Sequence, residues 1–385
     1  MSDLKLLFAG DAVVDASTTQ IAVGSNLKNI IGRCDLVSCN FEAPIKVDGA
    51  FAITKAGPAI FQQRNAIAAL RGAGFNFFNL SNNHILDYGG KSCLNTIEEL
   101  KDGASAGAGT FEQCYSYKLL NLKGIRVALL SLSEWGFGVL DDANSVKGEI
   151  GYAWVGHPLV EDLIRKAKNE ADIVIAQLHA GVEDISVPWP EWRNIYRRII
   201  DWGCDLIIAH HPHVPQGYET YKNKKIFYSL GNFYFDMASS HPLWNKSYCV
   251  EVDIVDRSIT GTTVHWTEKK GASIETDNNK QTSDLEAELC SNLQEPKYTE
   301  LVNKYTQELW RDRYSGYYTQ SFNTLTRKFG LKYNFQVAMK YLFGRDKTQN
   351  ELLLHNIAIE SHRFVAERFL KDTWKKNAHL ASSDS

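Results

Sequence analysis

The sequence predicts an α/β domain followed by a helical domain, and three observations lead to this prediction. Short apolar runs alternate with amphipathic stretches in the first part of the chain, a polar segment follows, and the last part has a helical pattern. Alternating strands and helices are typical of layered α/β domains. We therefore expect an α/β domain at 1–268, a linker or loop at 269–284, a helical C-terminal domain at 285–376 and a flexible tail at 377–385.

The predicted strands share one property, which is that each ends in polar residues. They are Leu4–Asp11, Cys34–Glu42, Phe75–His84, Ala171–Gly181 and Cys204–His213. Apolar runs of this length, bounded by Gly, Asn or Pro, are typical of buried strands. Helical patterns lie between them at 61–74, 159–171 and 191–203, and strand-like alternation at 115–133 and from 225 onward predicts hairpins. Part of the sheet system should therefore be antiparallel.

Composition and charge exclude several classes of protein. The net charge of -3 supplies no general basic field, so we expect no nucleic-acid partner. Seven cysteines without a C-x-x-C pair indicate reduced thiols instead of a disulfide framework. The sequence shows neither an apolar signal segment nor a membrane span of about eighteen residues. We expect a cytoplasmic protein without an integral membrane segment.

The polar residues at the predicted strand ends form the main candidate site. They are Asp11, Asn40, Glu42, Asn82, Asn83, His84, His179, Glu183, His210, His211 and His213. Each one alone has an ordinary explanation as a turn, cap or hydrogen-bonded structural residue. In open α/β sheets, however, ligands gather beyond the carboxyl ends of the strands, and five such ends in one chain favour a divalent-metal site. A carboxylate such as Glu42 can bridge two ions.

Six motifs in this chain are similar to those of a known family. They are "FAGD", "CNFEAP", "LSNNHILDYG", "HAGVED", "HHPHVPQG" and "YSLGNFYFD", and the similarity extends from about Leu4 to Asp236. Together they resemble the bacterial capsule synthesis protein CapA family, also called poly-gamma-glutamate synthesis proteins, in the calcineurin-like metallophosphoesterase superfamily. The resemblance implies a calcineurin-like metallophosphoesterase sandwich of two mixed β-sheets flanked by helices.

The resemblance also implies roles for individual residues. One or two divalent ions, Mn, Fe or Zn, would be bound by Asp11, Glu42, Asn83, His179, His211 and His213. His84 would donate a proton or stabilise charge. The superfamily usually has a histidine two residues after its first aspartate, whereas this chain has Val13, so the first ion would have one fewer imidazole.

Further residues complete the predicted site. Glu183 follows His179 by four residues and is expected either to orient that imidazole or to act on substrate, and we count it with His84 as catalytic. His210 should point to the opposite side from His211 because adjacent strand residues alternate, so we expect it to support the ligands from behind or to be structural. Four residues are expected to contact an anionic substrate: Asn40, Asn82, Lys55 and Asn232.

The predicted function is a metal-dependent hydrolase that acts on a phosphoester or related bond in the synthesis of a capsule, poly-gamma-glutamate or a surface polysaccharide. Its substrate would be a small or polymer-derived anion. The alternative is a non-catalytic, metal-dependent anion-binding or assembly component that contacts a synthase through the helical C-terminal domain. A nuclease is the third hypothesis, which the absence of a basic stripe beside aromatic residues disfavours.

Overall fold

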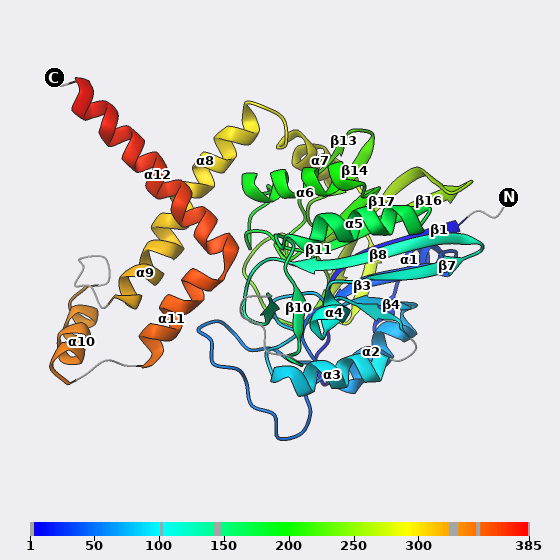
Figure 1. Ribbon diagram of the computed structural model, residues 1–385, viewed down its shortest axis with the longest axis horizontal. Coiled ribbons are helices and arrows are strands. Elements are labelled where there is room, and N and C mark those ends of the chain that lie inside the picture. Colours follow the sequence, from blue (N-terminus) through cyan, green and yellow to red (C-terminus); the bar gives the residue numbers. More distant parts are fainter. Residues whose placement is uncertain (1–3, 101–102, 142–147, 323–329, 344–346, 384–385) are drawn as a thin grey trace. The chain divides into compact units, whose positions relative to one another are not determined.

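The computed structural model describes residues 4–100, 103–141, 148–322, 330–343 and 347–383 (Figure 1). The chain forms two compact units. The larger unit contains Met1–Ile53 and Ile60–Tyr298, and the smaller unit contains Thr54–Ala59 and Thr299–Ser385. Among the described residues, no helix is long and apolar enough to cross a membrane.

The first sheet of the larger unit is mixed and has nine strands among the described residues, in the order β2-β18-β17-β16-β1-β3-β4-β5 with β15 beside β1. These strands are β1 (Leu4–Val13), β2 (Ala22–Val23), β3 (Leu36–Phe41), β4 (Phe77–Asn79), β5 (Ser105–Ala106), β15 (Asn232–Phe235), β16 (Lys246–Val255), β17 (Ser258–Lys270) and β18 (Ser273–Thr276). β1 pairs in parallel with β3 and β15 and antiparallel with β16. The parallel part therefore brings the carboxyl ends of β1, β3 and β4 to one edge.

The second sheet is also mixed, with the order β13-β14-β12-β11-β8-β7. Its strands are β7 (Tyr117–Leu122), β8 (Ile125–Ser133), β11 (Ile173–His179), β12 (Leu206–His210), β13 (Tyr218–Tyr221) and β14 (Lys224–Phe227). The central strands β8, β11, β12 and β14 are parallel, and the outer pairs are antiparallel hairpins. A small third sheet contains β6 (Ala108–Gly109), β9 (Val139–Leu140) and β10 (Gly151–Ala153).

Side chains that alternate between the two faces of β1 contribute to two buried layers of the sandwich. Leu6 and Phe8 of β1 share one buried apolar layer with Leu129 of β8 and Ile175 of β11, so this layer lies between the two sheets. Leu7, on the opposite face of β1, belongs to a second layer with residues of α1 (Ser25–Gly32), α2 (Arg64–Gly72) and α3 (Gly89–Leu100). Since successive strand residues face opposite sides, one strand serves both layers.

Helices cover the outer faces of the larger unit. α5 (Leu159–Glu170) and α6 (Pro190–Trp202) run along the second sheet, and the short α4 (Phe111–Cys114) lies beside β10 (Figure 1). α6 starts with Pro190 and ends at Gly203, whose φ of 124° is typical of a glycine that terminates a helix. The predicted fold class, two mixed sheets flanked by helices and followed by a helical region, is confirmed.

The structure differs from the sequence analysis at 269–284, which was expected to be a linker or loop. This segment carries the end of β17, all of β18 and the start of α7 (Lys280–Ser291). Gly271, with φ of 61°, forms the turn that lets β18 pair with β17. Glu286 of α7 then accepts hydrogen bonds from Tyr218 and Trp266, both at 2.7 Å. The larger unit consequently extends beyond residue 268.

The smaller unit is helical in its described residues. It contains most of α8 (Lys297–Leu309), the π-helical turn η1 (Trp310–Tyr314), α9 (Ser315–Ser321), α10 (Gly330–Phe343), α11 (Lys347–Ala358) and α12 (Glu360–Ser383). Val302, Tyr314 and Val365 are buried. The tail expected at 377–385 is helical as far as Ser383, because the sequence of α12 contains neither Gly nor Pro to end the helix earlier.

Candidate metal centre

Asp11 and Asn40 lie side by side at the carboxyl edge of the first sheet. The parallel register pairs Asp11 of β1 with Asn40 of β3, and both side chains are fully buried. The Asn40 amide donates a hydrogen bond of 2.7 Å to Asp11 Oδ1, and its Nδ2 lies 3.0 Å from Nδ1 of His179. Asn40 thus orients Asp11 and His179, while the substrate contact expected for it stays a prediction.

Glu42 follows β3 and has one buried carboxylate oxygen without a hydrogen-bond partner. Its side chain is fully buried, and the oxygen without a partner is Oε1. This oxygen lies 3.6 Å from Nε2 of His213, 3.8 Å from Nε2 of His179 and 3.9 Å from Nε2 of His84. Burial raises the pKa of Glu42 to about 8, against the opposing effect of His213. A buried carboxylate oxygen among three imidazole nitrogens has the arrangement expected of a metal ligand.

His179, at the end of β11, converges on the same space. Its Nε2 lies 2.9 Å from Oδ1 of Asn83 and 3.0 Å from Nδ1 of His211. Burial, followed by the charge of His211, lowers the pKa of His179 well below its usual range. The neutral imidazole is the form that binds a metal.

His211 is held from its other side by a residue that the sequence analysis did not identify. Its Nε2 lies 3.0 Å from Oε1 of Glu134, which directly follows β8 and is buried. The rule that polar residues gather at strand ends would have found Glu134, but 115–133 was interpreted only as a hairpin. Carboxylates that hydrogen-bond to a ligand histidine fix its orientation and raise its basicity.

His210 lies against Asp11, and its expected role, to support the ligands or to be structural, stays a prediction. Its ring is fully buried, and Nδ1 lies 3.7 Å from Oδ1 of Asp11. Side-chain alternation applies only within a strand, and β12 ends at His210. His211 and His213 have φ of 97° and 60°, so the chain turns sharply through this motif and parity no longer decides which side chains face inward.

Five of the predicted ligands and Glu183 gather in two groups that could each hold a metal ion. One group is Asp11, Glu42 and His179, and the other is Glu183, His211 and His213. Within each group the ligand atoms lie within 4.8 Å of one another. Oxygen and imidazole ligands of this kind fit a borderline divalent ion. Glu183, expected to be catalytic, is therefore within reach of two of the expected ligands.

His84 is positioned by a second residue that the sequence analysis did not identify. Its Nδ1 lies 2.6 Å from Oδ2 of Asp87, and this oxygen also accepts a hydrogen bond of 2.8 Å from the backbone N–H of Ile60. The spacing His-x-x-Asp was the available signal. Asn82 supports the same loop, because its amide donates to the carbonyl of Phe41 at 3.0 Å. The Nε2 of His84 is left facing Glu42.

Asn232 and the glycine before it shape the far side of the site. Oδ1 of Asn232 lies 3.0 Å from Nδ1 of His213, and its amide donates to the carbonyl of Trp244 at 3.2 Å. β15 can approach β1 this closely because Gly10 has no side chain: a Cβ there would lie 1.8 Å from the carbonyl oxygen of Gly231. The glycines of "FAGD" and "SLGN" are thus a steric requirement of the site.

Charge interactions at His213 and Asp11 favour their ionised forms in the absence of an ion. Burial alone would lower the pKa of His213, but the carboxylates of Glu42 and Asp11 raise it to about 10. Burial alone would raise the pKa of Asp11, but the hydrogen bond from His213 and the charge of His210 lower it. Lys55, predicted to contact substrate, belongs to the smaller unit, so its role stays a prediction.

Comparisons with known proteins agree with the motifs of the site. Residues 5–237 match the family model described as "Bacterial capsule synthesis protein PGA_cap". The chain is 35% identical over 243 residues to the "Capsule biosynthesis protein CapA" of Bacillus anthracis, which covers 57% of this chain and 58% of that protein. It is 31% identical over 216 residues to the "PGA biosynthesis protein CapA" of Bacillus subtilis (strain 168), covering 54% of this chain and 55% of that protein.

The chain spans a little over half of the length of these two curated relatives. Among solved structures, the 5'-nucleotidase of Candida albicans SC5314 is similar with a TM-score of 0.40 at 10% sequence identity, over 80% of this chain and 58% of that chain. Similarity at this level gives no information about the activity of this chain. The chemistry of the site is therefore inferred from the residues of this chain.

Proposed function

Because the chain belongs to the bacterial capsule synthesis protein family, we propose that it is a divalent-metal-dependent hydrolase acting on a phosphoester or related bond in capsule or poly-gamma-glutamate synthesis. The single observation that supports this proposal most strongly is the buried Oε1 of Glu42. It has no hydrogen-bond partner and faces three imidazole nitrogens. A buried carboxylate oxygen left open in this way has a cost in stability that a bound cation would remove.

The residues that would hold one or two ions come from both sheets. Asp11 and Glu42 supply carboxylates from the first sheet, and His179, His211 and His213 supply imidazoles from the second. Asn83 adds an amide oxygen close to His179, and Glu183 adds a carboxylate close to His211 and His213. A bound divalent ion would act as a Lewis acid that polarises the reacting bond. Because a carboxylate oxygen of Glu183 lies close to His211 and His213, Glu183 is better suited to bind an ion than to act only in catalysis.

His84 is the best candidate for proton transfer. Asp87 accepts the Nδ1 proton, which leaves Nε2 directed toward Glu42 and the centre of the site. An imidazole whose far nitrogen is fixed by a carboxylate keeps one tautomer and one orientation. In its protonated form, His84 would donate a proton to the leaving group or stabilise its negative charge.

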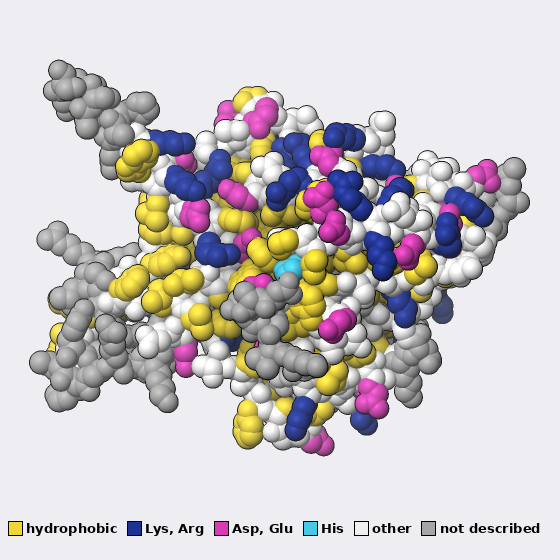
Figure 2. Space-filling view, in the orientation of Figure 1, with side chains coloured by type: hydrophobic (Ala, Val, Ile, Leu, Met, Phe, Trp, Pro, Cys, Tyr) yellow, Lys and Arg dark blue, Asp and Glu magenta, His cyan; other side chains and the backbone are white. Residues whose placement is uncertain are grey.

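A second function is favoured by one observation. Val13 lies where the superfamily usually supplies a further histidine, and in the structure Val13 is a buried strand residue paired with Phe235 of β15. The site could then bind an ion and an anion without turnover and serve in assembly with a synthase. On the face drawn in Figure 2, basic and acidic side chains are interspersed over α5 and α6. This mixture does not favour the nuclease hypothesis.

Hydrolysis assays separate these functions. The chain and its His179→Ala variant would be compared on an aryl phosphate and on gamma-glutamyl amides, with Mn²⁺, Zn²⁺ or Fe²⁺ added. We expect metal-dependent turnover that falls at least about 100-fold in the variant, because loss of a ligand weakens binding of the ion whose positive charge would stabilise the reacting bond. Lys225→Met, in the larger unit and outside the site, is the control. Metal binding without turnover on any substrate would favour the assembly function.

A further inference from the structure

A groove beside the candidate metal centre has the properties of a binding site for part of a substrate. It has a volume of about 680 Å³ and is lined by Ala16, Ile45–Gly49, Phe61, Gln63–Asn65 and Asn95. These residues come from the segments that follow β1 and β3, from the start of α2 and the residues before it, and from the middle of α3. They extend from the same carboxyl edge that carries Asp11 and Glu42. Cavities of about 300 to 1,000 Å³ are typical of small-molecule sites.

The groove is joined rigidly to the candidate metal centre through Gln62. This side chain is buried and accepts a hydrogen bond of 2.9 Å from the backbone N–H of Val14. Its amide nitrogen lies 3.2 Å from the carbonyl of Glu42 and 3.4 Å from that of Ala12. One side chain thus fixes the wall of the groove to both strands that carry the carboxylates. A ligand held in the groove would therefore have a defined position relative to these strands.

Lys46 supplies the cation of the groove. Its Nζ lies 4.9 Å from the ring centre of Phe61 and 4.7 Å from that of Tyr88, and the two rings meet edge to face at 5.1 Å. Lys46 forms no ion pair with a carboxylate in the described part of the chain, whereas Arg64 at the same groove is paired with Glu99 at 2.8 Å. Aromatic faces hold an ammonium group in place without neutralising its charge. The charge of Lys46 remains available to a ligand.

Two features select the kind of anion. Asp48 also lines the groove and is exposed, so a dianion such as phosphate would be repelled. A single carboxylate next to an amide fits better, since Lys46 can bind the carboxylate and Asp48 can accept a hydrogen bond from the amide N–H. We propose that this groove binds a carboxylate-bearing, amide-linked unit of the substrate, such as a glutamate residue of a chain, away from the reacting bond.

This inference rests on the proposed function for its choice of substrate, but it can be tested without turnover. Binding of gamma-linked triglutamate to the full chain would be measured by calorimetry, with gamma-linked triglutamine as the uncharged probe. The variants are Lys46→Met, which keeps the stem and removes the charge, and Lys46→Arg, which keeps the charge. The thermal unfolding midpoint of each variant would show that it remains folded.

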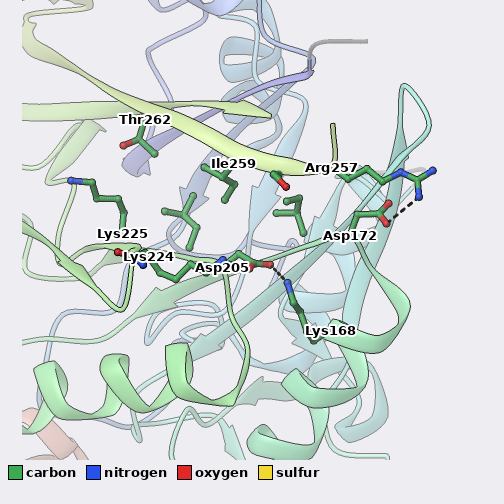
Figure 3. A pocket seen from close by; sticks show the side chains of 12 residues that line it. Lys168, Asp172, Asp205, Lys224, Lys225, Arg257, Ile259 and Thr262 are labelled. Atoms are coloured by element: carbon green, nitrogen blue, oxygen red, sulfur yellow. Dashed lines mark hydrogen bonds and ion pairs between the residues drawn. The ribbon is translucent and has the colours of Figure 1, made fainter. Parts of the chain in front are cut away.

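Lys225→Met is the matched control. Lys225 also lies over an aromatic ring, with Nζ 5.1 Å from the ring centre of Tyr218, and it also lines a cavity, of about 220 Å³. That cavity lies at the opposite ends of the strands, beside Asp205 and Arg257, and Figure 3 shows Lys225 extending away from Asp205. The two lysine variants therefore change net charge equally and differ only in location.

We expect Lys46→Met to weaken triglutamate binding at least tenfold, Lys46→Arg to retain it within about threefold and Lys225→Met to leave it unchanged. Binding of triglutamine should be weak and indifferent to all three changes. Equal losses in Lys46→Met and Lys225→Met, no binding by the unaltered chain, or displacement of triglutamate by an equal concentration of inorganic phosphate would overturn the proposal. If only the aryl phosphate assay failed, the proposed hydrolase function would be contradicted, whereas the proposed binding of glutamate units in the groove would not.

Discussion

Two buried carboxylates of the larger unit, at opposite ends of its strands, differ in how completely their oxygens are hydrogen-bonded. Asp205, at the start of β12, has both oxygens occupied: Oδ2 accepts from Lys168 at 2.7 Å and from the backbone N–H of Val174 at 2.9 Å, and Oδ1 accepts from Lys224 at 2.6 Å. Glu42, after β3, is more deeply buried and leaves Oε1 without a partner. A carboxylate that serves folding has its bonds completed by the protein, whereas one that serves binding leaves them open.

The largest effect should follow from Glu42→Gln. Loss of the central carboxylate should lower metal-dependent kcat/KM at least about 100-fold. The same change should raise the free energy of unfolding of the chelator-treated protein at pH 7 by about 1 kcal/mol. Glutamine is neutral at every pH, whereas Glu42, with its pKa raised to about 8, has to be protonated at a cost when the chain folds at pH 7. Kinetics and urea denaturation measure the two effects. A loss of both activity and stability would mean that Glu42 is a structural residue like Asp205.

Glu134→Gln should have the next largest effect, through His211. We expect metal affinity to fall about 10- to 100-fold, because the carboxylate that orients a ligand imidazole is lost. Competition with a metal-binding dye measures the affinity. Glu286→Gln is the control, because Glu286 also accepts two side-chain hydrogen bonds but lies on α7. Equal metal affinity in the two variants would exclude Glu134 from the site.

Asp205→Asn tests the other side of the comparison. The change should lower the free energy of unfolding by about 1 to 3 kcal/mol, since two lysines and a backbone N–H lose a charged partner. Because both lysines are 42% exposed, water screens these pairs and the lower end of that range is expected. Metal affinity should be unchanged. Weaker metal binding in this variant would show that the two ends of the strands are coupled.

The smallest effect concerns acid stability away from the site. Burial alone would raise the pKa of Glu219, but hydrogen bonds from Arg197, Arg193 and Tyr228 lower it to about 2. A carboxylate with a depressed pKa adds stability above its unfolded pKa, about 4.5, and loses it as the pH falls toward the folded value. The advantage of the unaltered chain over Glu219→Gln should therefore be full at pH 6 and shrink between about pH 4.5 and 2. Denaturation at several pH values measures it, and a constant difference would contradict the assignment.

Much of the fold and most of the site residues follow from local sequence signals. Apolar runs locate β1, β3, β11 and β12. The polar residues after them lie together because the carboxyl ends of parallel strands from both sheets meet at the same end of the sandwich. The residues from these strand ends form both groups of potential ligands. Val13 was identified from the motif alone, and its burial in β1 agrees with the absence of a ligand there. The binding of ions to these groups stays a prediction.

What the sequence could not supply depended on backbone conformation and on distant contacts. Alternation could not give the directions of the three histidines, because the positive φ of His211 and His213 turns the backbone there. Glu134 and Asp87 gain their roles only when His211 and His84 are brought next to them. The segment 269–284 looks like a linker in composition, yet long-range pairing with β17 makes part of it a strand.

The proposed chemistry requires a divalent ion at the carboxyl ends of the strands, so the most direct measurement is the metal content of the full chain purified without chelator. Mass spectrometry of the digested protein should find one to two equivalents of Mn, Fe or Zn, and Glu42→Gln should reduce them while Asp205→Asn does not. No metal in the unaltered chain, together with no affinity for any of these ions when they are added, would contradict the central claim.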